Sequence, residues 1–342
     1  MRTDLFDYDL PPEFIAQQPA DPRDASRLML LNRASGAIAH AHFRDLGRHL
    51  RAGDLLILNN TRVIPARLFA HKDRTGGKVE LLLLRRLAPR TWEALVGGRS
   101  LGVGAVMNVE GAPRLRATVL EVQDGPRRVI QFSQPIRPLL ERVGHVPLPP
   151  YIHQELAERD RYQTVYAFMP GSAAAPTAGL HFTPELMISL RAQGVEIDFI
   201  TLHVGLDTFA PVTEDEPEQH NMHGEWAEVS IPTADRINAA RREGRRVIAV
   251  GTTTVRTLES AAQKAEPGQT VAPMLDTTHL YILPGHIFRA VDGMITNFHL
   301  PRSTLLMLVS AFAGRDHILN AYDCAKREGY RFYSFGDAML IA

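Results

Sequence analysis

The chain has 342 residues and a mass of 38.0 kDa, and 45% of its residues are hydrophobic, so it can build a large core and more than one domain. Its 38 basic and 38 acidic side chains cancel, which excludes an overall field that would attract nucleic acid or an anionic membrane. One cysteine excludes an internal disulfide and a multi-cysteine zinc site. It also fits a reducing compartment, so we expect a cytoplasmic protein.

The first 132 residues carry signals for strands. Apolar runs at 28–31 and 55–58 predict buried strands. Strand-like segments, each followed closely by Gly, Pro or Asp, then occur at 67–72, 78–86, 91–96, 105–109, 114–122 and 127–132. Several short strands at this spacing predict a small antiparallel barrel or sandwich. Five prolines between residues 135 and 150 mark its end.

Beyond residue 151 strands alternate with helices, most clearly at 195–205 and 245–263. Continuous β-branched runs followed by helices are typical of a parallel sheet buried on both faces. The two early apolar runs have the same character, so we assign residues 1–65 to this part. The predicted fold is an α/β catalytic domain of residues 1–65 and 150–342, interrupted by a β-barrel domain of residues 66–149. The segment 303–314 predicts a buried helix, because it is too short to span a membrane.

Four segments carry polar residues at places where ligands commonly bind. The glycine and threonines of 251–254 join a strand to a helix, although a simple helix cap would explain a threonine there equally well. His181 follows a glycine in PTAGLHF, and His203 ends an apolar strand, where a histidine is more often a core residue. Asn297 and His299 precede the predicted buried helix, on a loop fixed by rigid elements.

Glu218, His220, His223 and Glu225 lie close together in the sequence and are residue types that can bind a metal. Zinc prefers such ligands, but the nearby proline and glycine indicate a loop and not the helix face that metal-binding histidine pairs usually share. We therefore expect polar surface or substrate contacts there, and no metal.

The motifs together are more specific than any one of them. Blocks from end to end closely resemble the S-adenosylmethionine:tRNA ribosyltransferase-isomerase family of queuosine biosynthesis. These blocks include NNTRVIPARL (59–68), GHVPLPPYI (144–152), PTAGLHF (176–182), TLHVG (201–205), VIAVGTTTVRTLESA (247–261), TNFHLPRSTLLMLVSAFAG (296–314) and YRFYSFGDAML (330–340). The sequence differs from the family pattern at one place. After TLHVG, Leu206 and Asp207 occupy positions at which the family resemblance leads us to expect small residues.

The resemblance implies an α/β fold with a small barrel and a specific reaction. The ribosyl part of S-adenosylmethionine is attached to 7-aminomethyl-7-deazaguanine at the wobble position of a tRNA anticodon loop. Epoxyqueuosine in tRNA is the product, and adenine and methionine are released. S-adenosylmethionine is consumed as a substrate, so no cofactor is expected. Two alternative functions stay open. One is an S-adenosylmethionine methyltransferase, although the sequence lacks the glycine-rich loop that such enzymes use. The other is a non-catalytic RNA-binding protein.

This chemistry needs a base of near-neutral pKa, and histidine supplies one. The three candidates, which the sequence does not rank, are His181, His203 and His299. The candidate substrate-binding residues are Gly251, Thr252, Thr253, Thr254, Arg256, Asn297, Arg302, Phe182, Phe298 and Tyr333.

The RNA contact must be local, since the net charge is zero. Arg62 and Arg67 lie where the chain passes into the predicted barrel, and they are the candidate RNA-binding residues. The arginines between 236 and 246 are better explained as a solvated helix face. We expect a monomer with no membrane contact.

Overall fold

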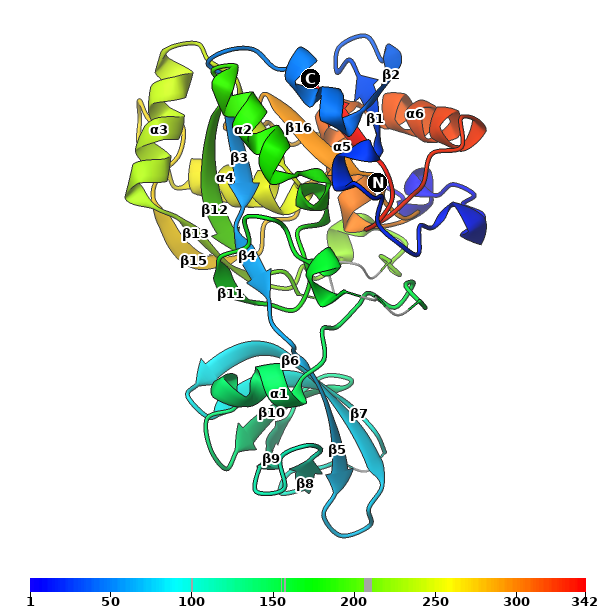
Figure 1. Cartoon of the computed structure of the whole chain (residues 1–342), viewed down its shortest axis with the longest axis vertical. Helices are drawn as coiled ribbons and strands as arrows, with labels where there is room; N and C mark the ends of the chain where they lie inside the picture. Colours follow the sequence, from blue (N-terminus) through cyan, green and yellow to red (C-terminus); the bar gives the residue numbers. More distant parts are fainter. Residues whose placement is uncertain (100, 155, 157, 206–210) are drawn as a thin grey trace. The chain divides into compact units, whose positions relative to one another are not determined.

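The computed structural model describes residues 1–99, 101–154, 156, 158–205 and 211–342. Figure 1 shows their helices and strands. Contacts group them into two compact units: the first comprises Met1–Thr61, Pro150–Met169 and Pro176–Ala342, and the second comprises Arg62–Pro149 and Pro170–Ala175. Among the described residues, none of the helices has the length and apolarity that crossing a membrane would require.

The first unit contains a sheet that has nine strands within the described residues. Their order across the sheet is β15 (Met274–Thr278), β13 (Glu225–Val229), β12 (Glu196–Leu202), β3 (Leu55–Asn59), β14 (Val247–Val250), β16 (Gly293–Asn297), β17 (Ala338–Ile341), β1 (Arg27–Leu31) and β2 (Ile38–His42). The strands β1 and β3 confirm the assignment of the early apolar runs to this sheet.

The prediction of a parallel sheet holds only for the centre and is corrected elsewhere. The strands β12, β3, β14 and β16 are mutually parallel, whereas β13, β15, β17 and β2 introduce antiparallel pairs. An apolar run shows that both faces of a strand are buried, but strand direction depends on how the chain returns to the sheet. The sheet is therefore mixed.

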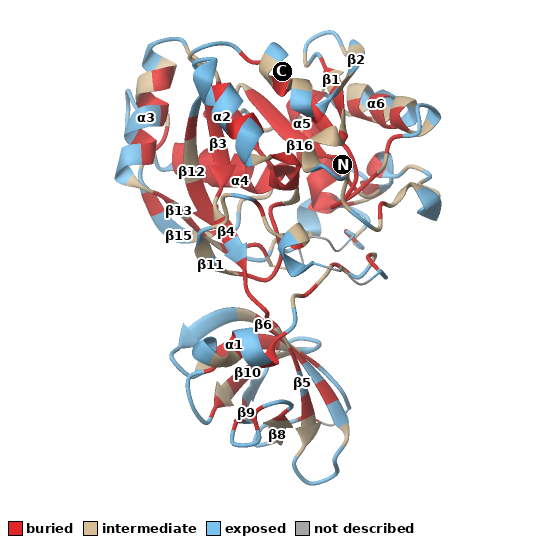
Figure 2. Ribbon diagram, in the orientation of Figure 1, coloured by how far each residue is buried: buried red, intermediate tan, exposed pale blue. Residues whose placement is uncertain are grey.

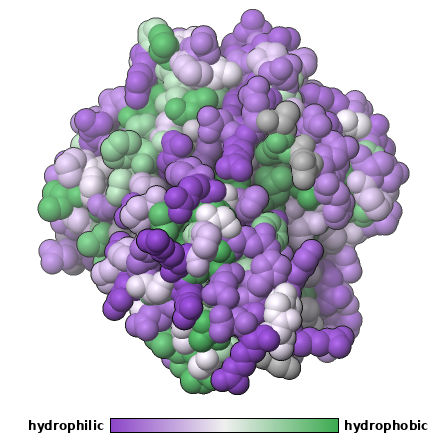
Figure 3. Space-filling model, turned by 60° about the horizontal axis from the view of Figure 1, so that its bottom comes forward, coloured by the Kyte–Doolittle hydropathy of each residue, from purple (hydrophilic) through white to green (hydrophobic). Residues whose placement is uncertain are grey.

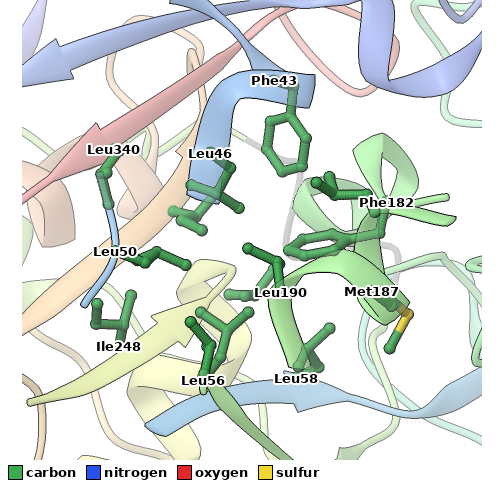
Figure 4. Packing of buried hydrophobic residues seen from close by; sticks show 14 of the residues in the cluster. Phe43, Leu46, Leu50, Leu56, Leu58, Phe182, Met187, Leu190, Ile248 and Leu340 are labelled. Carbon is green, nitrogen blue, oxygen red and sulfur yellow. The ribbon is translucent and has the colours of Figure 1, made fainter. Parts of the chain in front are cut away.

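Both faces of the central strands are buried (Figure 2). In β3, Leu56 and Leu58 point into a cluster with the helices η4 (Phe43–Arg48) and α2 (Pro184–Ala192). Figure 4 shows Leu190 of α2 packed against these leucines. The alternate residues Leu55 and Ile57 point to the other face and are also fully buried. This double burial explains why the strand is a continuous apolar run.

The helices begin and end where the sequence indicates. Ser303 caps α5 (Thr304–Ala313) by accepting the backbone N–H of Leu306 at 3.1 Å, and Gly314 ends the helix with a φ of 88°. The helix α4 (Thr252–Gln263) follows β14 directly and is buried along almost its whole length. Three further helices are α1 (Leu140–Val143), α3 (Ile231–Arg242) and α6 (Arg315–Arg327).

The second unit contains a closed antiparallel barrel. Its strands, in order around the barrel, are β10 (Arg127–Phe132), β7 (Thr91–Gly97), β6 (Lys78–Ala88), β5 (Arg67–Lys72), β8 (Val106–Val109) and β9 (Arg116–Val122). Buried and less buried residues alternate along β7, where Trp92, Ala94 and Val96 are buried. All six predicted segments form strands of this barrel, which confirms it. A short pair of strands, β4 (Thr61–Val63) and β11 (Met169–Ser172), lies where the chain passes between the units.

Candidate active site

Polar residues gather at the carboxyl edge of the parallel strands. Asn59 ends β3 and Asn297 ends β16, while His203 and Gly251 follow β12 and β14. These four strands are neighbours and run in the same direction, so their ends share one edge of the sheet. Ligands of α/β proteins commonly bind at this edge. The fourth predicted segment, PTAGLHF, joins them through His181, whose Nε2 lies 3.2 Å from Nδ2 of Asn297. The structure thus brings all four predicted polar segments together, along with Asn59, which the local sequence did not single out.

Asn59 ties three elements together. It is fully buried, and its Oδ1 accepts the backbone N–H groups of Leu202 at 3.0 Å and Thr61 at 3.1 Å. Its Nδ2 donates to the Leu202 carbonyl at 3.0 Å and to Oγ1 of Thr253 at 3.4 Å. The ends of β3 and β12 and the start of α4 are therefore fixed to one another. The block NNTRVIPARL contains Asn59, but local sequence alone gave it no role.

His203 lies just beyond β12 and is partly exposed. Its Nδ1 is 2.8 Å from Oγ1 of Thr61. The imidazole stacks on Trp226, with ring centroids 4.9 Å apart and an angle of 21° between the planes. The backbone N–H of His203 donates to the Trp226 carbonyl at 2.9 Å. Contacts from β4 and β13 therefore orient this ring.

His181 is buried in the core. Its Nδ1 is 2.8 Å from Oγ of Ser26, its Nε2 is 3.2 Å from Nδ2 of Asn297, and its ring stacks on Phe43. Burial lowers the pKa of His181 to about 4. Both nitrogens have protein partners, so this ring is neutral at physiological pH and already engaged.

His299 is also buried. Its Nε2 is 2.8 Å from Oγ1 of Thr296, and its backbone N–H donates to the Tyr322 hydroxyl at 2.9 Å. Burial lowers the pKa of His299 to about 3. The three histidines, equivalent in sequence, thus differ in environment, and only His203 among them is partly exposed.

The loop after β14 turns at Gly251 before α4 begins. Gly251 has a φ of 91°, which favours glycine, and its N–H donates to the Ile295 carbonyl at 2.8 Å. Gly251 is the N-cap residue of α4, and no side chain caps the helix there. Helix capping therefore does not account for the threonines of this loop. Thr254 Oγ1 donates back to the Val250 carbonyl at 2.6 Å. Thr252 and Thr253 lie in the first turn of the helix, where Thr253 Oγ1 accepts the hydrogen bond from Asn59.

Arg256 has a structural contact that the sequence did not suggest. Its side chain is only 2% exposed, Nη1 pairs with Glu225, and Nε donates to the Leu280 carbonyl at 3.1 Å. Glu225 also accepts the N–H of Gly205 at 2.9 Å. Arg256 therefore joins α4 to β13 and to the segment after β12. Its Nη2 is buried without a hydrogen-bond partner among the described residues.

Strained residues border the end of β16. Tyr333 has a φ of 75° and Arg302 a φ of 56°, a region that residues other than glycine rarely adopt. Asn297 donates to the Tyr333 carbonyl at 3.0 Å. Within the described part of the chain, the Tyr333 hydroxyl and the Arg302 Nε are buried and lack hydrogen-bond partners. Strain together with unsatisfied polar atoms is typical of functional sites.

Two of the candidate substrate-binding residues, Phe182 and Phe298, are fully buried aromatic side chains. Phe182 is fully buried in the cluster of Figure 4. Its ring packs edge-on against Phe43, with the ring centroids 5.0 Å apart. Phe298 is fully buried against Tyr322, Tyr330 and Phe332. Core packing takes up both rings, so neither can stack on an inserted base in this structure.

Three residues of the cluster Glu218, His220, His223 and Glu225 pair with different partners. Glu218 pairs with the amino group of Met1 at 2.6 Å, and His220 lies 3.0 Å from Glu214. Glu225 is bound to Arg256, as described above. The unusual Leu206 and Asp207 lie outside the described residues.

The fold defines a class: an α/β protein whose mixed sheet carries polar residues at the carboxyl ends of its parallel strands, with a closed antiparallel barrel inserted in the chain. A family model described as a queuosine biosynthesis protein matches residues 3–341. The chain therefore belongs to the S-adenosylmethionine:tRNA ribosyltransferase-isomerase family of queuosine biosynthesis.

Similar proteins cover the whole chain. Curated relatives named S-adenosylmethionine:tRNA ribosyltransferase-isomerase are 55% identical in Moorella thermoacetica and 56% identical in Symbiobacterium thermophilum, with full coverage of both chains. A crystal structure of an S-adenosylmethionine tRNA ribosyltransferase from Thermotoga maritima is 40% identical, with a TM-score of 0.58. That match covers 99% of this chain and 100% of the Thermotoga chain. The resemblance noted in the sequence is confirmed.

Proposed function

We propose that this enzyme transfers and isomerises the ribosyl moiety of S-adenosylmethionine onto 7-aminomethyl-7-deazaguanine in tRNA. The products are epoxyqueuosine in tRNA, adenine and methionine. The observation that carries the proposal is the end-to-end family match, supported by relatives above 50% identity over the whole chain. The α/β unit is the proposed catalytic domain. A monomer in the cytoplasm remains a prediction from the sequence.

The reaction begins with removal of a proton from C5′, which the neighbouring sulfonium acidifies. The resulting ylide expels adenine, the amine of the deazaguanine then attacks, and rearrangement forms the epoxide as methionine leaves. A base of near-neutral pKa suits the first step. A hydrogen-bond donor near the leaving adenine would assist the second step, the expulsion of adenine.

His203 is the proposed base. It lies at the carboxyl edge of the sheet, is partly exposed, and has a ring oriented by Thr61 and Trp226. His181 and His299 are buried, and their pKa values of about 4 and about 3 make them weak bases with little driving force for accepting a proton. These differences support ranking His203 first.

S-adenosylmethionine is proposed to bind along the same edge. Thr252 and Thr253 at the start of α4 suit its carboxylate or ribose hydroxyls, because helix N-termini favour anions and polar groups. The unsatisfied polar atoms of Tyr333 and Arg302 are proposed ligand contacts beside Asn297.

Arg62 is the stronger of the two proposed RNA contacts. It is exposed on β4, whereas Arg67 pairs with Glu80 at 2.9 Å. The arginines near α3 are largely neutralised: Arg241 pairs with Asp292, and Arg246 with the buried Asp54. Hydrophilic residues cover most of the face in Figure 3, so hydropathy alone marks no RNA surface.

Replacing Arg62 with alanine should weaken tRNA binding at low salt. The slope of log affinity against log salt should fall by about one unit, because one phosphate contact is lost. Filter binding over a salt series measures it. Arg236→Ala is the matched control, an arginine on α3 paired with Asp198, and should leave the slope unchanged. An unaltered slope in Arg62→Ala would place the RNA surface elsewhere.

Product analysis tests the function itself. With tRNA bearing the precursor base, the purified protein should convert S-adenosylmethionine to adenine and methionine in equal amounts. S-adenosylhomocysteine would instead identify a methyltransferase. Binding of tRNA with no turnover would identify an RNA-binding protein.

A further inference from the structure

One aromatic side chain is exposed beside the candidate active site. Phe168 lies directly before β11 and is 75% exposed. Its backbone N–H donates to the Asn60 carbonyl at 2.8 Å, and the N–H of Met169 donates to the same carbonyl at 3.1 Å. Asn60 follows the end of β3 and precedes Thr61, which contacts His203. The backbone of Phe168 is therefore fixed next to the carboxyl edge of the sheet.

The other aromatic rings offer no comparable surface. Among the described phenylalanines, tyrosines and tryptophans, only Phe69 is also classed as exposed, at 37%. Phe69 lies on the barrel strand β5 and packs edge-on against His145, with the ring centroids 5.1 Å apart. Single exposed hydrophobic residues are common on protein surfaces. What distinguishes Phe168 is that its exposed ring belongs to a segment bonded to the candidate site.

The RNA substrate supplies a group that fits such a ring. Bases in an RNA loop are unpaired, and proteins commonly hold them by stacking them on aromatic side chains. Every base has a π-face, so a phenylalanine can bind one without any hydrogen-bonding group. A ring this exposed is open to a macromolecule, whereas S-adenosylmethionine is proposed to bind at the start of α4.

We propose that Phe168 stacks on an unpaired base of the tRNA anticodon loop and so holds the loop at the carboxyl edge of the sheet. This inference rests on the proposed function, in which tRNA is a substrate. The ring contributes stacking, which involves no charge, whereas Arg62 is proposed to contact a phosphate. The two contributions should therefore differ in their dependence on salt.

The central test removes the ring from its surface position. Phe168→Ala should weaken tRNA binding by about 5- to 150-fold, the usual cost of losing one stack between a base and an aromatic side chain. The factor should be similar at every salt concentration of a filter-binding series, because no phosphate contact is lost. The thermal midpoint should stay unchanged, since the side chain is exposed. Affinity within about twofold of the parent value, below the range for a lost stack, would overturn the proposal.

Two further replacements separate stacking from a simple hydrophobic contact. Phe168→Tyr keeps an aromatic face and should bind tRNA nearly as tightly as the parent. Phe168→Leu keeps an apolar side chain without that face, so it should lose most of the affinity that Phe168→Ala loses. Equal binding by Phe168→Leu and the parent would show that no base stacks on this ring, and would overturn the proposal.

A matched control tests whether any exposed hydrophobic residue has the same effect. Ile287 is 78% exposed in the loop before β16. Ile287→Ala should leave tRNA affinity unchanged, and a loss equal to that of Phe168→Ala would overturn the proposal.

Other occupants of the ring give different results with Phe168→Ala. Unaltered tRNA affinity with weaker binding of S-adenosylmethionine in calorimetry would assign the ring to the small substrate and overturn the proposal. Unaltered tRNA affinity with a changed sedimentation coefficient would assign it to a protein interface, with the same consequence.

Failure of this inference can be distinguished from failure of the proposed function. If the parent enzyme neither binds nor modifies tRNA, the proposed function is wrong and so is the stacking role. If the parent does both and Phe168→Ala matches it in both, only the stacking role is wrong.

Discussion

Replacing His203 with glutamine is expected to lower turnover by at least about 10²-fold, the usual cost of removing a general base. Glutamine keeps a polar side chain of similar length at the end of β12, so the fold and the affinity for S-adenosylmethionine should persist. The variant should also fail to exchange solvent deuterium into C5′, if the parent enzyme shows that exchange. Steady-state kinetics with precursor tRNA and mass spectrometry of recovered S-adenosylmethionine measure both effects.

The other two histidines provide the controls. His181→Gln and His299→Gln should chiefly lower the thermal midpoint, because each replaces a buried ring whose partners would be left poorly satisfied, at about 1–3 kcal/mol. Their folded fractions should retain turnover. Turnover within about tenfold of the parent in His203→Gln, below the range expected for a lost base, would transfer the role to a carboxylate or to the amine of the substrate.

The second large effect is expected from Arg256→Ala. The arginine is 2% exposed and its partner Glu225 is 6% exposed, so truncation leaves a buried carboxylate without its cation. Breaking such a pair typically costs about 3–5 kcal/mol of unfolding free energy. The anchoring of Gly205 through Glu225 should weaken as well. Urea denaturation followed by circular dichroism measures the loss.

Two comparisons show whether this loss comes from the unpaired charge. Replacing Arg256 and Glu225 together by alanine should destabilise the chain by less than the sum of the single changes, because no charge stays unpaired. Arg236→Ala, which breaks an exposed pair with Asp198, should cost about 0.5 kcal/mol or less. A fully stable Arg256→Ala that loses only S-adenosylmethionine affinity would restore the ligand-binding role predicted from the sequence.

The elements whose signals are local could be predicted from the sequence. The six barrel segments, the buried strands β3 and β14, and the helix from Ser303 to Gly314 all follow from apolar patterning, turn residues and caps. The carboxyl edge of the sheet was also predictable in part, because Gly251 and His203 lie at the ends of predicted apolar strands. That Asn297 ends a strand of the same sheet was not predicted. End-to-end motifs identified the family. Each of these signals is carried by neighbouring residues and needs no knowledge of distant contacts.

The tertiary structure decided which of the predicted residues remain available for chemistry. His181, His203 and His299 have similar local sequence settings, but the fold buries the first and the third and leaves His203 partly exposed. Residues distant in sequence supply the partners that matter: Thr61 meets His203 across 142 positions, and Glu225 meets Arg256 across 31.

Strand direction and aromatic burial were likewise set by the fold. An apolar run gives the same sequence pattern in a parallel or an antiparallel strand, so β17 could not be oriented from its residues. Phe182 and Phe298 were candidate substrate-binding residues in the sequence, but packing with distant segments buries both rings. The sequence by itself therefore determined the elements, the family and the edge of the sheet where the site lies. Only the packing of distant segments decided which side chains there are buried, paired or exposed, because those properties depend on contacts that no local pattern encodes.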